Sequence, residues 1–126
     1  MPKQAFVSPD LPAPAGPYSQ VVEANGIVFT AGFGPQDPAT GEVPEGVAAQ
    51  TEGVIRNVER ALAVVGLTLA DVVKTTVHLA DLADFAAFNE VYGRIFPAPY
   101  PVRTTVGSAL NDILVEIDAV AIRTEA

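Results

Sequence analysis

The sequence contains no cysteine, so the chain has neither a disulfide bond nor a thiolate nucleophile. This absence is consistent with a reducing compartment. Histidine is almost as scarce, because His78 is the only one, and a metal site built from several histidines is excluded. A mixed site of His78 with Asp81 or Asp84 is the remaining metal candidate. A lone histidine in a strand is more typical of a structural or surface residue, and we expect no metal.

Long uncharged segments are also missing. None approaches the roughly 18 residues that a membrane-spanning helix needs. The first 20 residues contain five prolines and no continuous apolar run, which does not match a signal peptide. We therefore expect a soluble, cytoplasmic protein without a membrane partner.

Basic residues are few. Seven lysines and arginines against fifteen acidic residues give a net charge of −8. Such a surface repels a phosphate backbone unless its basic residues cluster, and no cluster is visible in the sequence. Nucleic acid is therefore not an expected partner.

The residues that are present predict one globular domain over residues 1–126, with 49% of the residues hydrophobic. Two apolar runs flank Asn25-Gly26, which is the strongest short signal for a β-hairpin. A loop rich in glycine and proline follows over Gly32–Gly46. Helical spacing of apolar residues then predicts a helix over Val47–Val65, ended by Gly66.

The second half of the chain continues with a strand over Asp71–Leu79, in which Val73, Thr75, Val77 and Leu79 alternate with other residues and share one face. Asp84 can cap a second helix that Pro97 ends, and the apolar face of this helix carries Phe85, Phe88, Tyr92 and Ile95. Two more strands are predicted, over Val102–Val106 and Ile113–Ile122. The order is β-β-α-β-α-β-β, an α+β architecture with a mixed sheet and two helices on one face.

Both faces of the predicted sheet carry apolar residues. In the last strand Val115 and Ile117 point one way and Val120 and Ile122 the other. Two helices can cover only one face, so a second face that stays partly apolar indicates burial against another subunit. The alternative is a solvent-exposed face with scattered valines, which is common in monomers.

Two charged residues interrupt apolar strands. Arg103 lies in "PYPVRTTV", and an arginine is rarely buried without a partner, so its head reaches water or pairs with a carboxylate of the protein or of a ligand. Glu116 lies in "ILVEIDAVAI", where a glutamate is either solvated at an edge or held by a specific partner. A raised pKa at Glu116 would suit acid–base chemistry. From the pattern, functional and structural roles for Glu116 are equally open.

Two other motif hypotheses fail. A serine-histidine-aspartate triad would have to use His78, and no serine lies in a segment like a nucleophile elbow. The segment Gly32–Gly34 follows a strand as a dinucleotide loop would, but Asp37 stands where the third glycine is needed and no helix opens there.

Five segments resemble the RidA family (also called the YjgF family) in the same order from about Ala13 to Ala121. They are "APAGPYSQVV", "GFGPQDPATGEV", "VVKTTVHLADLADFAAFNEVYGRIF", "PVRTTV" and "LVEIDAVA". The resemblance implies the fold of the small trimeric chorismate mutase, with homotrimers and sites between subunits. It also implies hydrolysis of the reactive enamine and imine acids 2-aminoacrylate and 2-iminobutyrate to 2-keto acids and ammonia. No metal or organic cofactor is implied.

The resemblance also assigns roles to individual residues. Arg103 matches the family arginine that binds the substrate carboxylate, and Tyr18 matches the tyrosine whose hydroxyl bonds the ligand or its water. Glu116 matches the glutamate that orients and polarises the attacking water. Gly32 matches a position whose backbone approaches the ligand, and Asn89 matches an asparagine near the cleft.

Three features depart from the family pattern. Thr105 stands where many members have a cysteine, and Ala31-Gly32-Phe33 stands where "SGQ" is usual, so an apolar residue replaces part of a polar wall. Thr105 and Phe33 both belong to the expected substrate-binding set. The loop over residues 107–112 lacks the common Leu-Pro and is shorter. Despite these departures the carboxylate-binding arginine is present, but the sequence does not predict which substrate side chain is preferred.

Two rival functions are compatible with the sequence. One is a family member that binds a small carboxylate, or regulates through it, without useful turnover. Glu116 would then be structural and could pair with Arg103. A ribonuclease activity has been attached to relatives, but the net charge of −8 and the single histidine argue against it.

Overall fold

The computed structural model describes residues 2–124, and its order of elements confirms the predicted one with one addition. The strands are β1 (Gln4–Phe6), β2 (Val21–Ala24), β3 (Ile27–Thr30), β4 (Val72–Leu79), β5 (Val102–Gly107) and β6 (Val115–Ile122). The helices are α1 (Val47–Val64) and α2 (Phe85–Ile95), and 3₁₀ turns at Leu69–Asp71 and Leu82–Asp84 precede β4 and α2. Strand β1 was not predicted, because three residues give no periodic signal and only pairing with β2 defines it.

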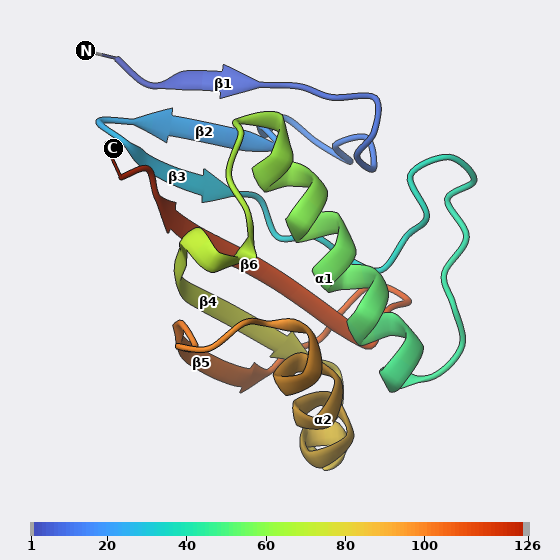
Figure 1. Cartoon of the computed structure of the whole chain (residues 1–126). Coiled ribbons are helices and arrows are strands. Elements are labelled where there is room, and N and C mark those ends of the chain that lie inside the picture. The colour runs from blue at the N-terminus through green and yellow to red at the C-terminus, as the bar shows by residue number, and fades with distance from the viewer. Residues whose placement is uncertain (1, 125–126) are drawn as a thin grey trace.

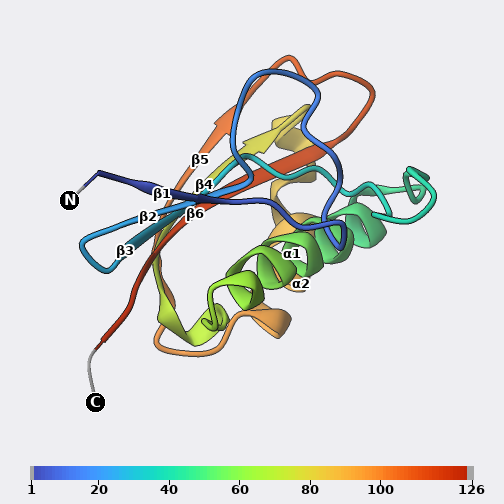
Figure 2. The same ribbon diagram turned by 90° about the horizontal axis from the view of Figure 1, so that it is seen from above.

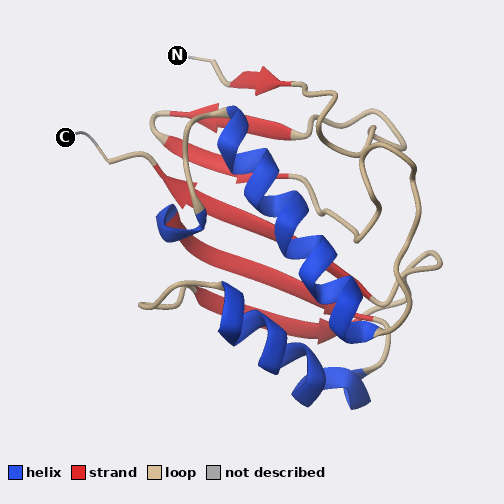
Figure 3. Ribbon diagram, turned by 45° about the vertical axis from the view of Figure 1, so that its right-hand side comes forward, coloured by secondary structure: helices blue, strands red, loops and turns tan. Residues whose placement is uncertain are grey.

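The strands form one six-stranded mixed sheet in the order β1-β2-β3-β6-β4-β5. Strands β4 and β5 are parallel, since α2 connects them as a crossover, and the other neighbours are antiparallel. Helix α1 runs diagonally across the sheet, and α2 lies beside it below β4 and β5 (Figure 1). Seen along the sheet, both helices lie on the same side (Figure 2), and Figure 3 shows them together on that face. The predicted one-sided cover is therefore confirmed.

The predicted hairpin is confirmed in its turn chemistry. Asn25 and Gly26 have φ angles of 53° and 79°, and positive φ at both central residues is what a tight hairpin turn requires. The backbone N–H of Arg123 donates to the carbonyl of Gly26 at 2.8 Å, which ties the turn to the end of β6.

Helix α1 supplies most of the cover. It buries Val54, Ile55 and Val58 against the sheet, and it ends one residue earlier than predicted, at Val64. Gly66, with φ of 78°, then turns the chain away, and its N–H donates to the carbonyl of Ala63.

Helix α2 differs from its prediction in two details. Asp84 occupies the N-cap position but its side chain makes no capping bond, whereas Asp81 accepts from the N–H of Ala83 at 2.9 Å and caps the preceding turn. Phe88 and Tyr92 are buried as expected, but Phe85 is 43% exposed. The 3₁₀ turn before α2 is a local tertiary feature that helical spacing alone does not predict.

One face of the sheet packs on the helices and forms the core. The buried residues of β6 are Val115, Ile117, Ala119 and Ala121, as the alternation predicted. In β4 the register shifts between Val72 and Lys74, so Val72 is buried and Val73 is 45% exposed. The prediction that Val73 shares the face of Thr75 and Val77 was wrong, because a bulge reverses the side-chain direction.

The other face, which we call the open face, has no helix over it. Exposed apolar side chains lie on two of its strands: Ile27 and Phe29 of the inner strand β3 are 38% and 45% exposed, and Val102 and Val106 of the edge strand β5 are 67% and 38% exposed. The predicted second apolar face is thus present. Within residues 2–124, no helix is long and apolar enough to cross a membrane.

Polar residues of β4, β5 and β6 also lie on the open face. Lys74 Nζ donates to Thr104 Oγ1 at 2.6 Å, and His78 Nδ1 lies 2.7 Å from Ser108 Oγ, which agrees with a structural role for the histidine. Burial raises the pKa of Asp118 above its ordinary value, although the positive charges of His78 and Lys74 oppose this rise. No group of three metal-binding side chains occurs in the part of the chain that the structure describes.

Asp118→Asn is expected to raise the melting temperature by a few degrees at neutral pH. The raised pKa means that the folded state holds the Asp118 proton more tightly, so this contribution to stability is lost as pH rises above the ordinary aspartate range. The difference between variant and wild type should therefore shrink as pH falls below about 4. Thermal unfolding across pH measures it, with the exposed Asp10→Asn as a control for net charge. An equal or lower melting temperature at neutral pH would contradict the prediction.

Candidate functional site

Glu116 and Gly32 form the first part of the candidate site. Strand β6 presents Glu116 on the open face. Its side chain lies beside Ala31 and Gly32, which follow β3. A Cβ atom placed on Gly32 would lie 2.7 Å from Glu116 Oε2 and 3.0 Å from its Cδ. The carboxyl group therefore rests against the glycine backbone, and a larger residue at position 32 would displace it.

Tyr18 lies in the same place. Tyr18, Gly32 and Glu116 together line two adjoining cavities of about 510 and 520 Å³. The backbone N–H of Ala15 donates to the Tyr18 hydroxyl oxygen at 3.0 Å, which leaves the hydroxyl proton available for a ligand. The predicted trio thus converges, with a donor and a carboxylate facing the same space.

Arg103 lies elsewhere, on the helix-covered face of β5. Its guanidinium carbon is 4.8, 5.3 and 5.6 Å from the ring centres of Tyr92, Phe88 and Phe85. Its Nη2 donates to Asn89 Oδ1 at 2.7 Å, and no carboxylate among residues 2–124 pairs with it. Aromatic stacking and one amide fix the guanidinium and leave donors for an anion.

The arginine has a cavity of its own. Asn89, Tyr92, Tyr100 and Arg103 line a space of about 360 Å³. Burial raises the pKa of the Tyr92 hydroxyl, which lies 2.8 Å from Thr75 Oγ1. Tyr92 therefore stays neutral and serves as a fixed wall for the guanidinium.

A single copy of the chain does not bring Arg103 and Glu116 together. Arg103 is in register with Thr75, which faces the helices, whereas Glu116 is in register with His78 on the open face. The two side chains therefore lie on opposite faces of the sheet and line different cavities. The pairing of Glu116 with Arg103 that a structural role suggested is absent within the described chain.

Comparison with known proteins assigns the chain to a family. The family model described as Endoribonuclease L-PSP matches residues 9–123. The chain is 39% identical over 125 residues to the Escherichia coli K12 protein named 2-iminobutanoate/2-iminopropanoate deaminase, covering 95% of this chain and 98% of that one. The chain belongs to the RidA family. It is also 43% identical over 122 residues to Reactive Intermediate Deaminase A of Arabidopsis thaliana, covering 94% of this chain and 65% of the plant protein.

Solved structures of RidA relatives share the fold. The structure described as E. coli TdcF with bound serine superposes with a TM-score of 0.91 at 37% identity, covering 96% of this chain and 99% of that one. The E. coli YjgF gene product gives the same TM-score at 38% identity, again covering 96% and 99%. The chorismate-mutase-like α+β fold implied by the RidA resemblance is therefore confirmed.

The two residues that depart from the RidA pattern lie in different surroundings. Thr105 is half-buried on the same face as Arg103 and is in register with Val77. Phe33 borders the 520 Å³ cavity, but it is only 4% exposed and belongs to the hydrophobic core. Its N–H donates to the carbonyl of Ile117 at 2.9 Å. Phe33 therefore lies at the cavity as expected, but its ring is buried in the core and offers little apolar surface to a ligand.

Sequence reasoning missed three buried amides that hold the loops around the 520 Å³ cavity. Gln20 Nε2 donates to the carbonyl of Pro12 at 3.0 Å. Gln50, on α1, accepts from the N–H of Leu114 at 2.8 Å and donates to the carbonyl of Pro44 at 3.0 Å. Gln50 lies on the apolar face of the predicted helix, and a polar amide at such a position indicates a buried side chain with specific hydrogen-bond partners.

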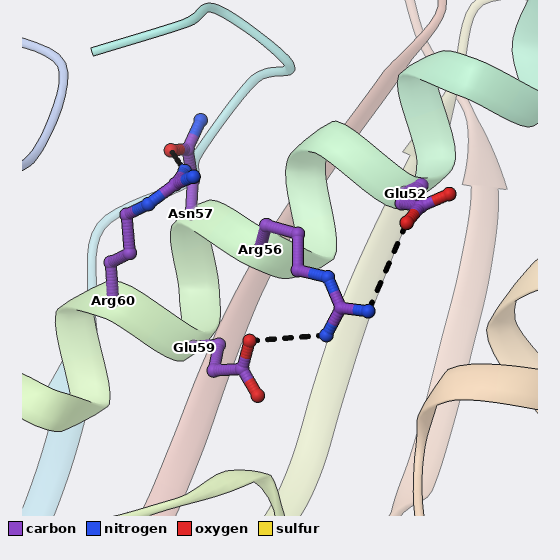
Figure 4. Close-up of polar contacts among 5 residues, drawn as sticks. All are labelled: Glu52, Arg56, Asn57, Glu59 and Arg60. Atoms are coloured by element: carbon purple, nitrogen blue, oxygen red, sulfur yellow. Dashed lines mark hydrogen bonds and ion pairs between the residues drawn. The ribbon is translucent and has the colours of Figure 1, made fainter.

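Asn57 is the third of these amides. Its Nδ2 donates to the carbonyls of Gly34 and Gln36, both at 2.9 Å, and its Oδ1 accepts from Arg60 at 2.8 Å. Figure 4 shows Asn57 and Arg60 together. Each loop around the cavity is therefore fixed by an amide whose own bonding groups are satisfied.

The arginine next to Asn57 has a different role. Arg56 lies between Glu59 at 3.1 Å and Glu52 at 3.8 Å (Figure 4). These are exposed pairs one helical turn apart, of a kind that stabilises a helix by about 0.3–0.5 kcal/mol. Arg56 is thus already engaged with protein carboxylates and is no candidate for the substrate site.

Gly32→Ala is expected to move the Glu116 carboxyl group without unfolding the protein. The new Cβ would overlap the far end of a flexible side chain, which can rotate away, so the melting temperature should change by only a few degrees. A crystal structure of the variant checks this. Gly93→Ala is the matched control, because there the nearest atom is Tyr100 Oη at 3.6 Å, an ordinary contact. An unmoved carboxyl group would contradict the prediction.

Proposed function

We propose that this chain hydrolyses reactive 2-enamine and 2-imino acids, such as 2-aminoacrylate and 2-iminobutyrate, to 2-keto acids and ammonia. The observation that carries the proposal is the Glu116 carboxyl group resting on Gly32, with the Tyr18 hydroxyl facing the same cavities. The 39% identity to a protein named as an imine deaminase supports the same reaction class.

In the proposed reaction each residue has one task. Arg103 binds the substrate carboxylate through its free donors, and Asn89 and the aromatic rings hold the guanidinium in place. Glu116 orients a water molecule and accepts its proton as the oxygen attacks the imine carbon. Tyr18 donates a hydrogen bond to the substrate or the water. An enamine substrate first takes a proton on C3 and becomes the protonated imine that the water attacks. The resulting aminoalcohol takes back on nitrogen the proton that Glu116 accepted; the C–N bond then breaks as the hydroxyl loses its proton, which releases ammonia and leaves the 2-keto acid.

The site would be built from two copies of the chain in a homotrimer. Arg103 and Glu116 lie on opposite faces of the sheet, so one copy cannot supply both to one small substrate. The exposed apolar side chains of β3 and β5 offer a surface that association would bury. Arg103 of one copy would then face the Glu116–Gly32 contact of its neighbour.

The main alternative is a member that binds 2-keto or related acids without turnover. The stacked guanidinium and its cavity favour carboxylate binding by themselves, whatever Glu116 does. Although the matching family model is described as an endoribonuclease, a net charge of −8 disfavours RNA, and we expect no RNA cleavage.

Arg103→Ala is expected to lower catalytic efficiency roughly ten- to a hundredfold, because a charge-assisted contact to a carboxylate contributes about 1.5–3 kcal/mol. Arg103→Lys should also be impaired, since a point charge cannot form the paired contact. The assay couples a threonine dehydratase to this protein and follows 2-ketobutyrate formation in time. Wild-type rates in both folded variants would remove Arg103 from the site. No rate enhancement by the wild type, with retained 2-ketobutyrate binding, would favour the alternative.

Mixing two inactive variants tests whether the site spans two copies. Arg103→Ala and Glu116→Gln subunits should each be nearly inactive alone. After co-refolding in equal amounts they should recover about a quarter of wild-type turnover, because random assortment pairs an intact Arg103 with an intact Glu116 in about one site in four. Sedimentation equilibrium should first give a trimer for each sample. A trimer without recovery, or a stable monomer with full activity, would contradict a shared site.

A further inference from the structure

The 520 Å³ cavity offers more room than the small imines of the proposed function need. It shares Tyr18, Gly32 and Glu116 with the first cavity and then continues between the Pro12–Ala15 segment, the loop after Gly34 and the loop before β6. Cavities of about 300–1,000 Å³ accept ligands of drug size, whereas the side chain of 2-iminobutyrate is a single ethyl group. The unshared part of this cavity thus has space for a longer side chain.

The charges in this cavity have one sign. The carboxylates of Glu116 and Asp37 line it, and no lysine or arginine does. Asp37 Oδ1 accepts from the N–H groups of Ala39 and Thr40, and these bonds lower the pKa of Asp37. The carboxylate is therefore charged at neutral pH. Arg60, whose charge also acts on Asp37, does not line this cavity, so a negatively charged ligand group inside it would meet carboxylates and no lining cation.

Two carboxamides line the unshared part of the cavity: Gln36 is half-buried and Asn111 is exposed. Neither side-chain amide forms a hydrogen bond with any residue in the described range 2–124. This contrasts with Gln20, whose amide is fully used in holding the Pro12 segment. The free oxygens of Gln36 and Asn111 can accept from a ligand donor.

We propose that the Gln36–Asn111 part of the cavity binds the substrate side chain, and that the chain prefers 2-imino acids whose side chain exceeds an ethyl group, carries hydrogen-bond donors and has no negative charge. A guanidinium-bearing side chain meets all three conditions. The inference rests on the proposed function, because it takes Glu116 as the place where the imine carbon reacts. It also answers the question left open by the short loop over residues 107–112, which contributes Asn111 to this wall.

The test compares three imines generated in situ by an amino-acid oxidase from arginine, norvaline and glutamate. The first carries donors, the second is apolar and the third is acidic. We expect kcat/KM to be about three- to tenfold higher for the arginine-derived imine than for the norvaline-derived one, and lowest for the glutamate-derived one. Calorimetric binding of the three corresponding 2-keto acids should give the same order.

The variant Gln36→Ala/Asn111→Ala should reduce the arginine-to-norvaline ratio of kcat/KM, and of the binding constants, about three- to tenfold. Gln4→Ala removes an exposed amide on β1, outside the cavity, and should leave both ratios unchanged. Equal ratios in the double variant and wild type, or a preference for the acidic substrate, would overturn the inference even if turnover of small imines is normal. Absence of turnover with every imine would refute the proposed function, and the binding order would still decide the preference of the cavity.

Discussion

Two helices can cover only one face of this six-stranded sheet, and the rest of the molecule depends on that constraint. The covered face becomes the core, and the strand alternation then sends every second side chain to the open face. Because Arg103 belongs to the covered set and Glu116 to the open set, the two chemical groups are separated by the sheet. The proposed function therefore connects catalysis with subunit association. The open face exposes the apolar side chains that association would bury, and it also carries Glu116, the group that would activate water.

Each half of the candidate site is held by contacts that suit its chemistry. The arginine stacks on aromatic rings and bonds one amide oxygen, so its charge is retained while its orientation is fixed. The glutamate has a bare glycine backbone on one side, which brings its carboxyl group close to the main chain. Three buried amides then fix the loops around it by satisfying backbone groups that would otherwise lie unpaired.

Much of the fold follows from local signals in the sequence. Asn25-Gly26 specifies a turn with two positive φ angles, and Gly66 stops α1 close to the predicted residue. Where the prediction failed, the cause was a contact distant in sequence or a local irregularity. Strand β1 exists through its pairing with β2, and the bulge after Val72 turns Val73 outward. Neither leaves a periodic pattern, since each depends on how strands meet rather than on residue type.

For the site, the sequence by itself determined which side chains are chemically unusual and which positions share a face. Alternation places Arg103 and Thr105 together, and resemblance to the RidA family assigned roles to Tyr18, Gly32 and Glu116. Only the tertiary structure decided which face the helices cover, and with it that Arg103 lies under α2 while Glu116 meets Gly32 on the opposite face. The reason is physical: alternation fixes the relative direction of neighbouring side chains, but helix packing and strand register, set by long-range burial, fix where those directions point.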